Sequence, residues 1–136
     1  MASFQKFHKF VENLAEEKFN LGSDQLQLAL TNAANPPSST GDGVLTDLTQ
    51  IAYTNLSAQT VTTSASAQTG GIYALVVADK VLTASGNVAA FQYVVLFDQD
   101  APSDELIGYY DYGSEVTLTA GETFTVDFSS SVLTIQ

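Results

Sequence analysis

The spacing of apolar residues along the chain predicts a helix followed by a strand. Between residues 3 and 19, phenylalanines and other apolar residues recur every three or four positions, which is typical of one face of a helix. Ser3 is the expected N-cap of this helix, and Gly22 is a stop signal beyond its end. Residues 25–30 then alternate between polar and apolar, which indicates a half-buried strand with its leucines inward.

A polar loop follows the first predicted strand. Residues 31–43 contain two prolines and two glycines, and this length favours a functional or mobile loop over a simple turn. The next segment, residues 44–53, has an ambiguous pattern. The spacing of its apolar residues suits a short helix, with Thr46 as a candidate cap.

The rest of the chain is predicted to form short strands with a turn about every ten residues. The expected strands are residues 60–68, 72–78, 80–84, 90–97, 106–112, 115–119, 122–128 and 132–136. Residues 90–97 are almost all apolar, so both faces of that strand should be covered. The predicted fold is therefore mainly β: an antiparallel β-sandwich or jelly roll of seven to eight strands with an N-terminal amphipathic helix.

The length of 136 residues predicts a single domain, with residues 1–20 as the helix and residues 21–136 as an acidic body. The helical part holds three lysines and three acidic residues and is neutral, so the body carries the entire net charge of −11. Nucleic-acid binding is not expected, because it depends on clusters of Lys and Arg. Such a body stays soluble, repels its own copies and favours a basic partner or a cation.

The residues that perform chemistry are scarce. The chain has no cysteine, no arginine and one histidine, His8, on the flank of the predicted helix. A catalytic triad cannot be assembled from this set, so no enzymatic activity and no cofactor are expected. No apolar run reaches the roughly 20 residues of a membrane span, and the first residues lack the apolar stretch of a signal peptide. Neither a membrane nor export through a signal peptide is therefore expected.

An acidic cluster is the one candidate for a metal site. Asp98, Asp100 and Asp104 crowd one predicted turn, and calcium is bound by several carboxylate oxygens. The spacing is not that of an EF-hand, since the glycine of its sharp turn is missing. A solvated acidic hairpin tip and a Ca²⁺ site both stay open, whereas a glycosidase pair is disfavoured because acids are abundant throughout the chain.

Three tyrosines occur close together at residues 109, 110 and 112. On a strand, Tyr110 and Tyr112 point to one side, whereas Tyr109 and Asp111 point to the other. Exposed aromatic rings beside a carboxylate would suit a sugar-binding face. Aromatic residues in a β-sandwich also serve in the core or in subunit contacts, and both interpretations stay open.

Several stretches together resemble a known family. They are FQKFHKFVENLA (residues 4–15), LGSDQLQLALTN (21–32), LIGYYDYGS (106–114), TLTAGETFTVDF (117–128) and VLT (132–134). They resemble a family of small virion structural proteins of tailed bacteriophages. The resemblance implies a protein without catalytic residues that is made in the host cytoplasm and located in the virion. It implies a capsid decoration (cement) protein that stabilises the head or, alternatively, a tail, neck or fibre-base component.

The partners implied by the resemblance are the major capsid protein or other virion proteins, with copies forming homo-oligomers or following the capsid lattice. Docking surfaces are expected on the helix, which holds the only positive cluster, on the proline-rich loop, on the tyrosines, or on a sheet edge near residue 136. The candidate docking residues are Phe4, Lys6, Phe7, Lys9, Pro36, Pro37, Tyr110 and Tyr112. Packing of the helix face on its own domain is the favoured interpretation, with docking of part of that face on another chain as the alternative. A sugar-binding attachment module is the alternative from another functional class.

Overall fold

The computed structural model describes residues 2–136, and these form a mainly β, antiparallel structure, as predicted. The nine strands are β1 (Gln5–Lys6), β2 (Leu26–Thr31), β3 (Thr63–Thr69), β4 (Ile72–Val77), β5 (Lys80–Thr83), β6 (Val88–Asp98), β7 (Leu106–Leu118), β8 (Thr123–Val126) and β9 (Leu133–Ile135). The helices within residues 2–136 are α1 (His8–Ala15) and the short 3-10 helix η1 (Leu45–Asp47). The strands therefore outnumber the seven or eight predicted.

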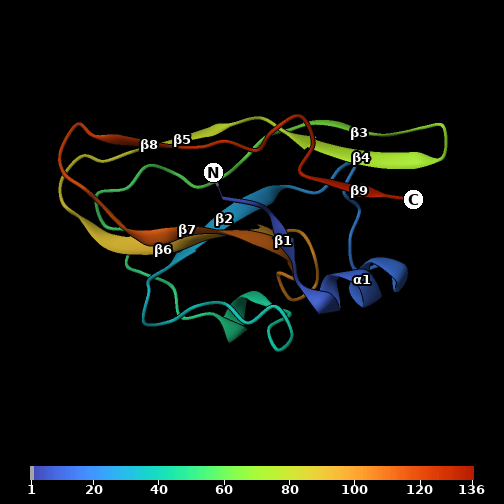
Figure 1. Cartoon of the computed structure of the whole chain (residues 1–136), viewed down its shortest axis with the longest axis horizontal. Coiled ribbons are helices and arrows are strands. Elements are labelled where there is room, and N and C mark those ends of the chain that lie inside the picture. The colour runs from blue at the N-terminus through green and yellow to red at the C-terminus, as the bar shows by residue number, and fades with distance from the viewer. Residues whose placement is uncertain (1) are drawn as a thin grey trace.

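The strands form three sheets arranged in layers. A four-stranded sheet has the order β1-β7-β6-β2, a three-stranded sheet the order β3-β4-β9, and β5 pairs with β8. Figure 1 shows the two smaller sheets side by side in one layer above the four-stranded sheet. In Figure 1 the segment that contains η1 lies on the opposite side of the four-stranded sheet, whereas helix α1 lies beyond the β1 end of that sheet, below the β3-β4-β9 sheet. No helix within residues 2–136 has the length and apolar character that crossing a bilayer requires.

The predicted helix over residues 3–19 is wrong at both ends. Gln5 and Lys6 form strand β1, which pairs with Tyr109 and Gly108 of β7. Phe7, rather than Ser3, occupies the N-cap position, with the extended dihedrals φ −73° and ψ 143°. The helix ends at Ala15, well before the predicted stop signal.

Aromatic packing explains why the first phenylalanines leave the helix. The ring centroids of Phe4 and Tyr110 lie 5.2 Å apart, and those of Phe7 and Tyr109 also lie 5.2 Å apart. Such pairs stabilise by about 0.5–1.5 kcal/mol beyond the apolar area that they bury. Residues 4–7 therefore follow strand β7, and the three-and-four spacing of their phenylalanines does not reflect a helix.

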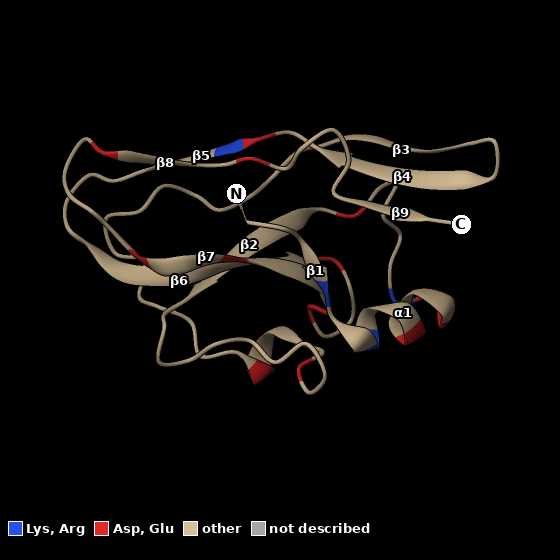
Figure 2. Cartoon of the chain, viewed as in Figure 1, with Lys and Arg blue, Asp and Glu red and all other residues tan. Residues whose placement is uncertain are grey.

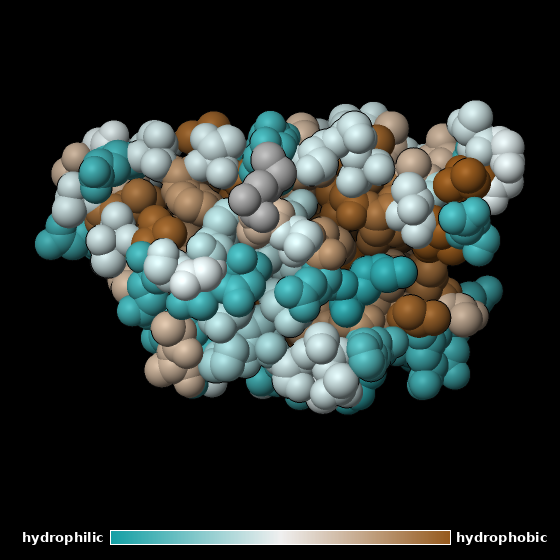
Figure 3. Space-filling view, viewed as in Figure 1, coloured by the Kyte–Doolittle hydropathy of each residue, from teal (hydrophilic) through white to brown (hydrophobic). Residues whose placement is uncertain are grey.

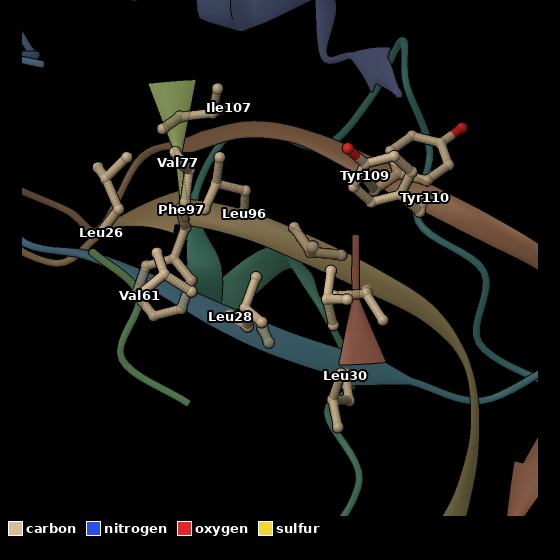
Figure 4. Close-up of a cluster of buried hydrophobic side chains, with 14 of the residues drawn as sticks. Leu26, Leu28, Leu30, Val61, Val77, Leu96, Phe97, Ile107, Tyr109 and Tyr110 are labelled. Carbon is tan, nitrogen blue, oxygen red and sulfur yellow. The ribbon is translucent and has the colours of Figure 1, made fainter. Parts of the chain in front are cut away.

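Strand β2 is buried on both faces, so the prediction of a half-buried strand is wrong. Leu26, Leu28 and Leu30 lie in a row on one face (Figure 4), while Ala29 and Thr31 on the other face are also fully buried. Its outer edge is covered by the chain itself. The carbonyl groups of Leu30 and Leu26 accept hydrogen bonds from the Ile51 and Val61 N–H groups, at 3.0 and 3.1 Å.

The short helix predicted in residues 44–53 is present as η1, although its N-cap is Val44 and not Thr46. The carboxylate of Asp47 accepts hydrogen bonds from the N–H groups of Gly43 and Val44, at 2.8 and 3.1 Å. These two bonds are the main reason why the pKa of Asp47 is lowered. Asp47 thus closes the start of η1 from inside the helix.

The two longest strands, β6 and β7, form the centre of the four-stranded sheet. The C-terminal half of β6 is buried, from Val94 to Asp98, so the prediction of a strand covered on both faces is confirmed there. Strand β7 is one element where two strands were predicted, over residues 106–112 and 115–119. One hydrophobic cluster includes residues from α1, from the four-stranded sheet and from both smaller sheets. The helix therefore packs on its own domain.

Candidate functional site

An apolar hollow lies between helix α1 and the β3-β4-β9 sheet. It has a volume of about 360 Å³ and is lined mainly by the apolar residues Leu14, Phe19, Leu21, Tyr73 and Ile135. A second hollow of about 270 Å³ shares Leu14 and Ile135 with the first, so the two form one depression. Figure 3 shows hydrophobic surface on both sides of it, at the right of the view. We call this depression the α1–β9 groove.

The floor of the α1–β9 groove comes from helix α1 and the turn that follows it. Phe10 of α1 is buried and packs on Phe19 with ring centroids 5.1 Å apart. Glu17 has a positive φ of 62°, and the Lys18 N–H donates a 2.9 Å hydrogen bond to the Asn13 carbonyl. The chain therefore reverses after α1 and returns beneath strand β4. Val11, one turn from Leu14, remains 60% exposed at the mouth of the groove.

The opposite wall of the groove is a sheet with an unpaired edge. Within residues 2–136, β9 pairs with β4 alone, so the other backbone edge of β9 is open. The β3–β4 hairpin turns at Gly70 and Gly71, which have φ of 61° and 83°, a conformation that glycine adopts without strain. Residues 67–72 of this hairpin are exposed. An open strand edge beside an apolar groove is a surface to which an extended peptide can add.

Lysines and acidic residues offset one another on the helical side of the groove. Lys6 lines the groove, and three of the four lysines of the chain occur within residues 1–20. Figure 2 shows basic and acidic segments together on and near α1. The Lys9 ammonium group donates a 2.9 Å hydrogen bond to the Gly41 carbonyl and so ties α1 to the proline-rich loop. The groove therefore lies in the least acidic part of a chain whose net charge is −11.

The structure separates the predicted docking residues into exposed and buried ones. Lys6, Lys9 and Pro36 are exposed, and of these only Lys6 lines the groove. Phe4 and Tyr112 are partly buried, since both pack on neighbouring aromatic rings. The prediction is wrong for Phe7, Pro37 and Tyr110, because all three are buried and cannot contact a partner in this structure.

The tyrosines of β7 serve the core. As predicted, neighbouring tyrosines point to opposite sides: Tyr110 packs with Tyr112 and Phe128, whereas Tyr109 packs with Phe7 and Tyr93. Burial raises the pKa of both Tyr110 and Tyr112 to about 12. The sugar-binding interpretation needs exposed rings, and Tyr109 and Tyr110 are only 7% and 5% exposed, which leaves the partly buried Tyr112 as the one ring of the three that it could use.

The acidic turn after β6 is folded around its own carboxylates. One oxygen of Asp98 accepts hydrogen bonds from the N–H groups of Asp100 and Ala101, at 2.9 and 3.2 Å. The Asp100 carboxylate accepts a 2.8 Å bond from the Gln25 N–H instead of turning toward Asp98. Asp104 adopts a positive φ of 54°. Within residues 2–136, no three acidic, histidine or cysteine side chains converge as ligands of a metal ion, so these aspartates do not form the Ca²⁺ site considered above.

The solvated-tip interpretation of this turn holds for Asp100, which is exposed, and is wrong for Asp98 and Glu105, which are only 0% and 4% exposed. Burial, followed by a hydrogen bond with the side chain of Asp24, raises the pKa of Asp98 from 3.8 to about 8. Sequence reasoning missed Asp24 entirely. It lies two residues before Leu26, which pairs with Asp98 across β2 and β6, and no local pattern reveals that register.

Comparisons with protein-family models, with curated proteins and with solved structures give no match to this chain. The resemblance to phage virion proteins therefore stays a prediction. The features that bear on function are the α1–β9 groove, the open edge of β9 and the distribution of charge.

Proposed function

We propose that this protein is a structural component of a tailed-bacteriophage virion: a decoration or cement protein, without enzymatic activity, that binds the capsid and stabilises the head. The single observation that carries the proposal is the α1–β9 groove beside the open edge of β9. The sequence resemblance supports the same class of protein. In this proposal the two β layers form a β-sandwich that serves as a rigid support for the docking surface.

The capsid contact that we propose is strand addition. An extended segment of the major capsid protein would hydrogen-bond to the open edge of β9 and place alternate apolar side chains in the groove. Main-chain hydrogen bonds then supply affinity, and the groove supplies selectivity. The exposed side chain of Val11, which lies at the mouth of the groove, would be covered by such a segment.

The charge distribution supports assembly on a lattice. A net charge of −11 on 136 residues keeps free copies apart in solution. The groove lies where lysines offset the acids, so a capsid segment meets little repulsion there. Free copies therefore stay separate until a capsid offers the matching segment.

The decisive experiment compares two exposed valines. Val11 is 60% exposed and lines the groove, whereas Val81 is 49% exposed on β5, away from the groove lining. We expect Val11→Glu to weaken binding to purified capsids at least tenfold, or about 1.4 kcal/mol, because the carboxylate must be desolvated in an apolar contact. Val81→Glu, the matched control, should bind like the unmodified protein.

Copy number tests the virion location separately. Mass spectrometry of purified particles should find copies in a fixed ratio to the major capsid protein, as lattice symmetry requires. A copy number that matches a single ring of subunits per virion would instead indicate a component of the tail, neck or fibre base. Absence from virions, or equal capsid binding by both valine variants, would contradict the proposal.

A further inference from the structure

A pair of carboxyl groups, Asp98 buried and Asp24 partly buried, joins the segment before β2 to the end of β6. Asp98 is completely buried, and one of its oxygens is held by the two N–H bonds described above. Its other oxygen, Oδ2, is buried and receives no hydrogen bond from any donor group among residues 2–136. The neighbour within hydrogen-bonding reach is the side chain of Asp24, which is a second carboxyl group.

The surroundings of the pair offer no positive charge. Asp24 faces Asp98 from the segment before β2, while Asp100, Asp104 and Glu105 belong to the turn after β6. The Glu105 carboxylate accepts a 2.8 Å hydrogen bond from the Ser103 N–H, and the Asp100 carboxylate accepts one from the Gln25 N–H. The groups that act on the Asp98 carboxyl are therefore Asp24 and the two N–H donors of the turn, in addition to burial itself.

Asp98 is fully buried, whereas Asp24 is partly buried. A buried carboxylate in contact with a second carboxylate is strongly disfavoured in its ionised form unless a proton or a cation lies between the two groups. A calcium ion takes six to eight oxygen ligands, and no third acidic side chain joins the pair to form a metal site within residues 2–136. A proton needs only the two oxygens that face each other. The geometry therefore favours a shared proton, as in other pairs of adjacent carboxyl groups.

We propose that Asp24 and Asp98 share a single proton and form a pH-dependent latch that holds residues 20–25 against the end of the four-stranded sheet. The Asn20 N–H donates a 2.8 Å hydrogen bond to the Asp24 carboxylate, and Asn20, Leu21 and Gly22 line the α1–β9 groove. The latch therefore connects the groove wall to the protonation of a buried acid. When the proton leaves, repulsion between the two carboxylates loosens this wall.

The direction of the pH dependence follows from the pKa of Asp98. It is raised in the folded protein to about 8 from the ordinary value of 3.8, so the folded chain keeps a proton that the unfolded chain releases. The stabilisation is complete below the unfolded pKa and is lost as the pH rises toward 8. Above pH 8 both states have lost the proton, and the contribution no longer changes.

The test combines a direct titration with a pair of charge-removing variants, all in the full chain. Carbon-detected NMR of the Asp98 carboxyl carbon should show a protonated group at pH 7. In EDTA, the unfolding equilibrium constant should rise by up to about tenfold per pH unit between pH 5 and pH 8. Asp98→Asn should abolish this rise, because its amide donates to Asp24 at every pH. Glu12→Gln, at an exposed position of α1, should retain it.

Three results would overturn the latch. An Asp98 carboxyl titration with its midpoint near 4 would show that no proton is shared. A pH dependence that persists in Asp98→Asn would assign it to another group. Stabilisation at pH 8 by added Ca²⁺ or Mg²⁺, present in the unmodified protein and absent in Asp98→Asn, would place a cation where we place the proton. If Asp98→Asn does not fold, the NMR titration of the unmodified chain still decides whether the Asp98 carboxyl group keeps a proton at pH 7.

Discussion

The four-stranded sheet and the β3-β4-β9 sheet belong to one hydrophobic cluster, yet they are built differently. In the four-stranded sheet, the central strands β6 and β7 carry large side chains that are buried on both faces over residues 94–98 and 106–110. In the β3-β4-β9 sheet, strand β3 has the sequence TSASAQT, and none of its residues is buried. The apolar residues that secure this second sheet come from β4 and β9, mainly Leu75, Val77 and Leu133.

This difference separates stability from recognition. The four-stranded sheet has its β2 edge covered by residues 51–61, and its stability comes from apolar burial. The β3-β4-β9 sheet keeps an open edge and an exposed hairpin, and such lightly packed regions are the usual place of binding surfaces. The substitutions below test this division of roles, in order of decreasing expected effect.

Leu96→Ala should give the largest loss of stability. Leu96 is 1% exposed in the buried C-terminal half of β6, and a Leu→Ala change at such a site costs about 2–5 kcal/mol through lost burial and the cavity left behind. Chemical denaturation followed by circular dichroism measures the change. Val81→Ala on β5 is the control, and it should stay within about 0.5 kcal/mol because Val81 is exposed. Equal losses of stability in both variants would contradict the view that burial in the four-stranded sheet supplies most of the stability.

Gly108→Ala should detach strand β1. A Cβ atom at residue 108 would lie 2.6 Å from the Gln5 carbonyl oxygen and would overlap the ring of Phe4. Because the backbone must shift to relieve these contacts, we expect the free energy of unfolding to fall by about 1–3 kcal/mol. Gly22→Ala is the matched control, since the nearest atom to its Cβ lies at 3.6 Å. Fast amide exchange confined to residues 5 and 6 would confirm the cause, and an unchanged exchange rate there would exclude it.

Tyr73→Phe should have a smaller effect, because it acts on the β3-β4-β9 sheet. It removes the 2.7 Å hydrogen bond between the Ser66 and Tyr73 hydroxyl groups across β3 and β4, which stabilises by about 1 kcal/mol. Ser66→Ala removes the same bond. The double variant should therefore lose less than the sum of the two single losses. Additive losses in urea denaturation would show that the hydroxyl groups act separately.

Ile72→Thr should change stability least, by less than about 0.5 kcal/mol, because Ile72 is 42% exposed beside the turn of the β3–β4 hairpin. Thermal unfolding measures the effect. A loss as large as that of Leu96→Ala would show that the hairpin is packed against something in solution, and the two sheets would then no longer differ in role.

Much of the strand pattern could be predicted from the sequence, because burial on a sheet imposes its own period. The alternation in residues 25–30 located β2 to within one residue, and the apolar run of residues 90–97 identified β6. The same reasoning failed for residues 3–7. Phenylalanines spaced by three are compatible with a helix, and only the rings of β7, a hundred residues away, decide between a helix and a strand.

The candidate sites were harder to predict than the strands, because each depends on contacts between distant segments. The exposed Val11 belonged to the predicted apolar face of the helix, yet nothing local showed that this face would meet β9. The acidic cluster drew attention to Asp98 for the wrong reason. Its partner, Asp24, is identified only by the register that places Leu26 opposite Asp98.

Strand β1 has a consequence for how the chain is made. The side-chain oxygen of Gln5, a residue of β1, accepts a hydrogen bond from the Tyr109 hydroxyl, and the two residues are 104 positions apart in the chain. During synthesis the first strand must therefore wait until most of the protein has left the ribosome before its partner exists. Closing such a long loop is slow, so the N-terminal segment should be among the last parts to settle. Until then the rings of Phe4 and Phe7 are uncovered, and the nascent chain is most prone to aggregate in that interval.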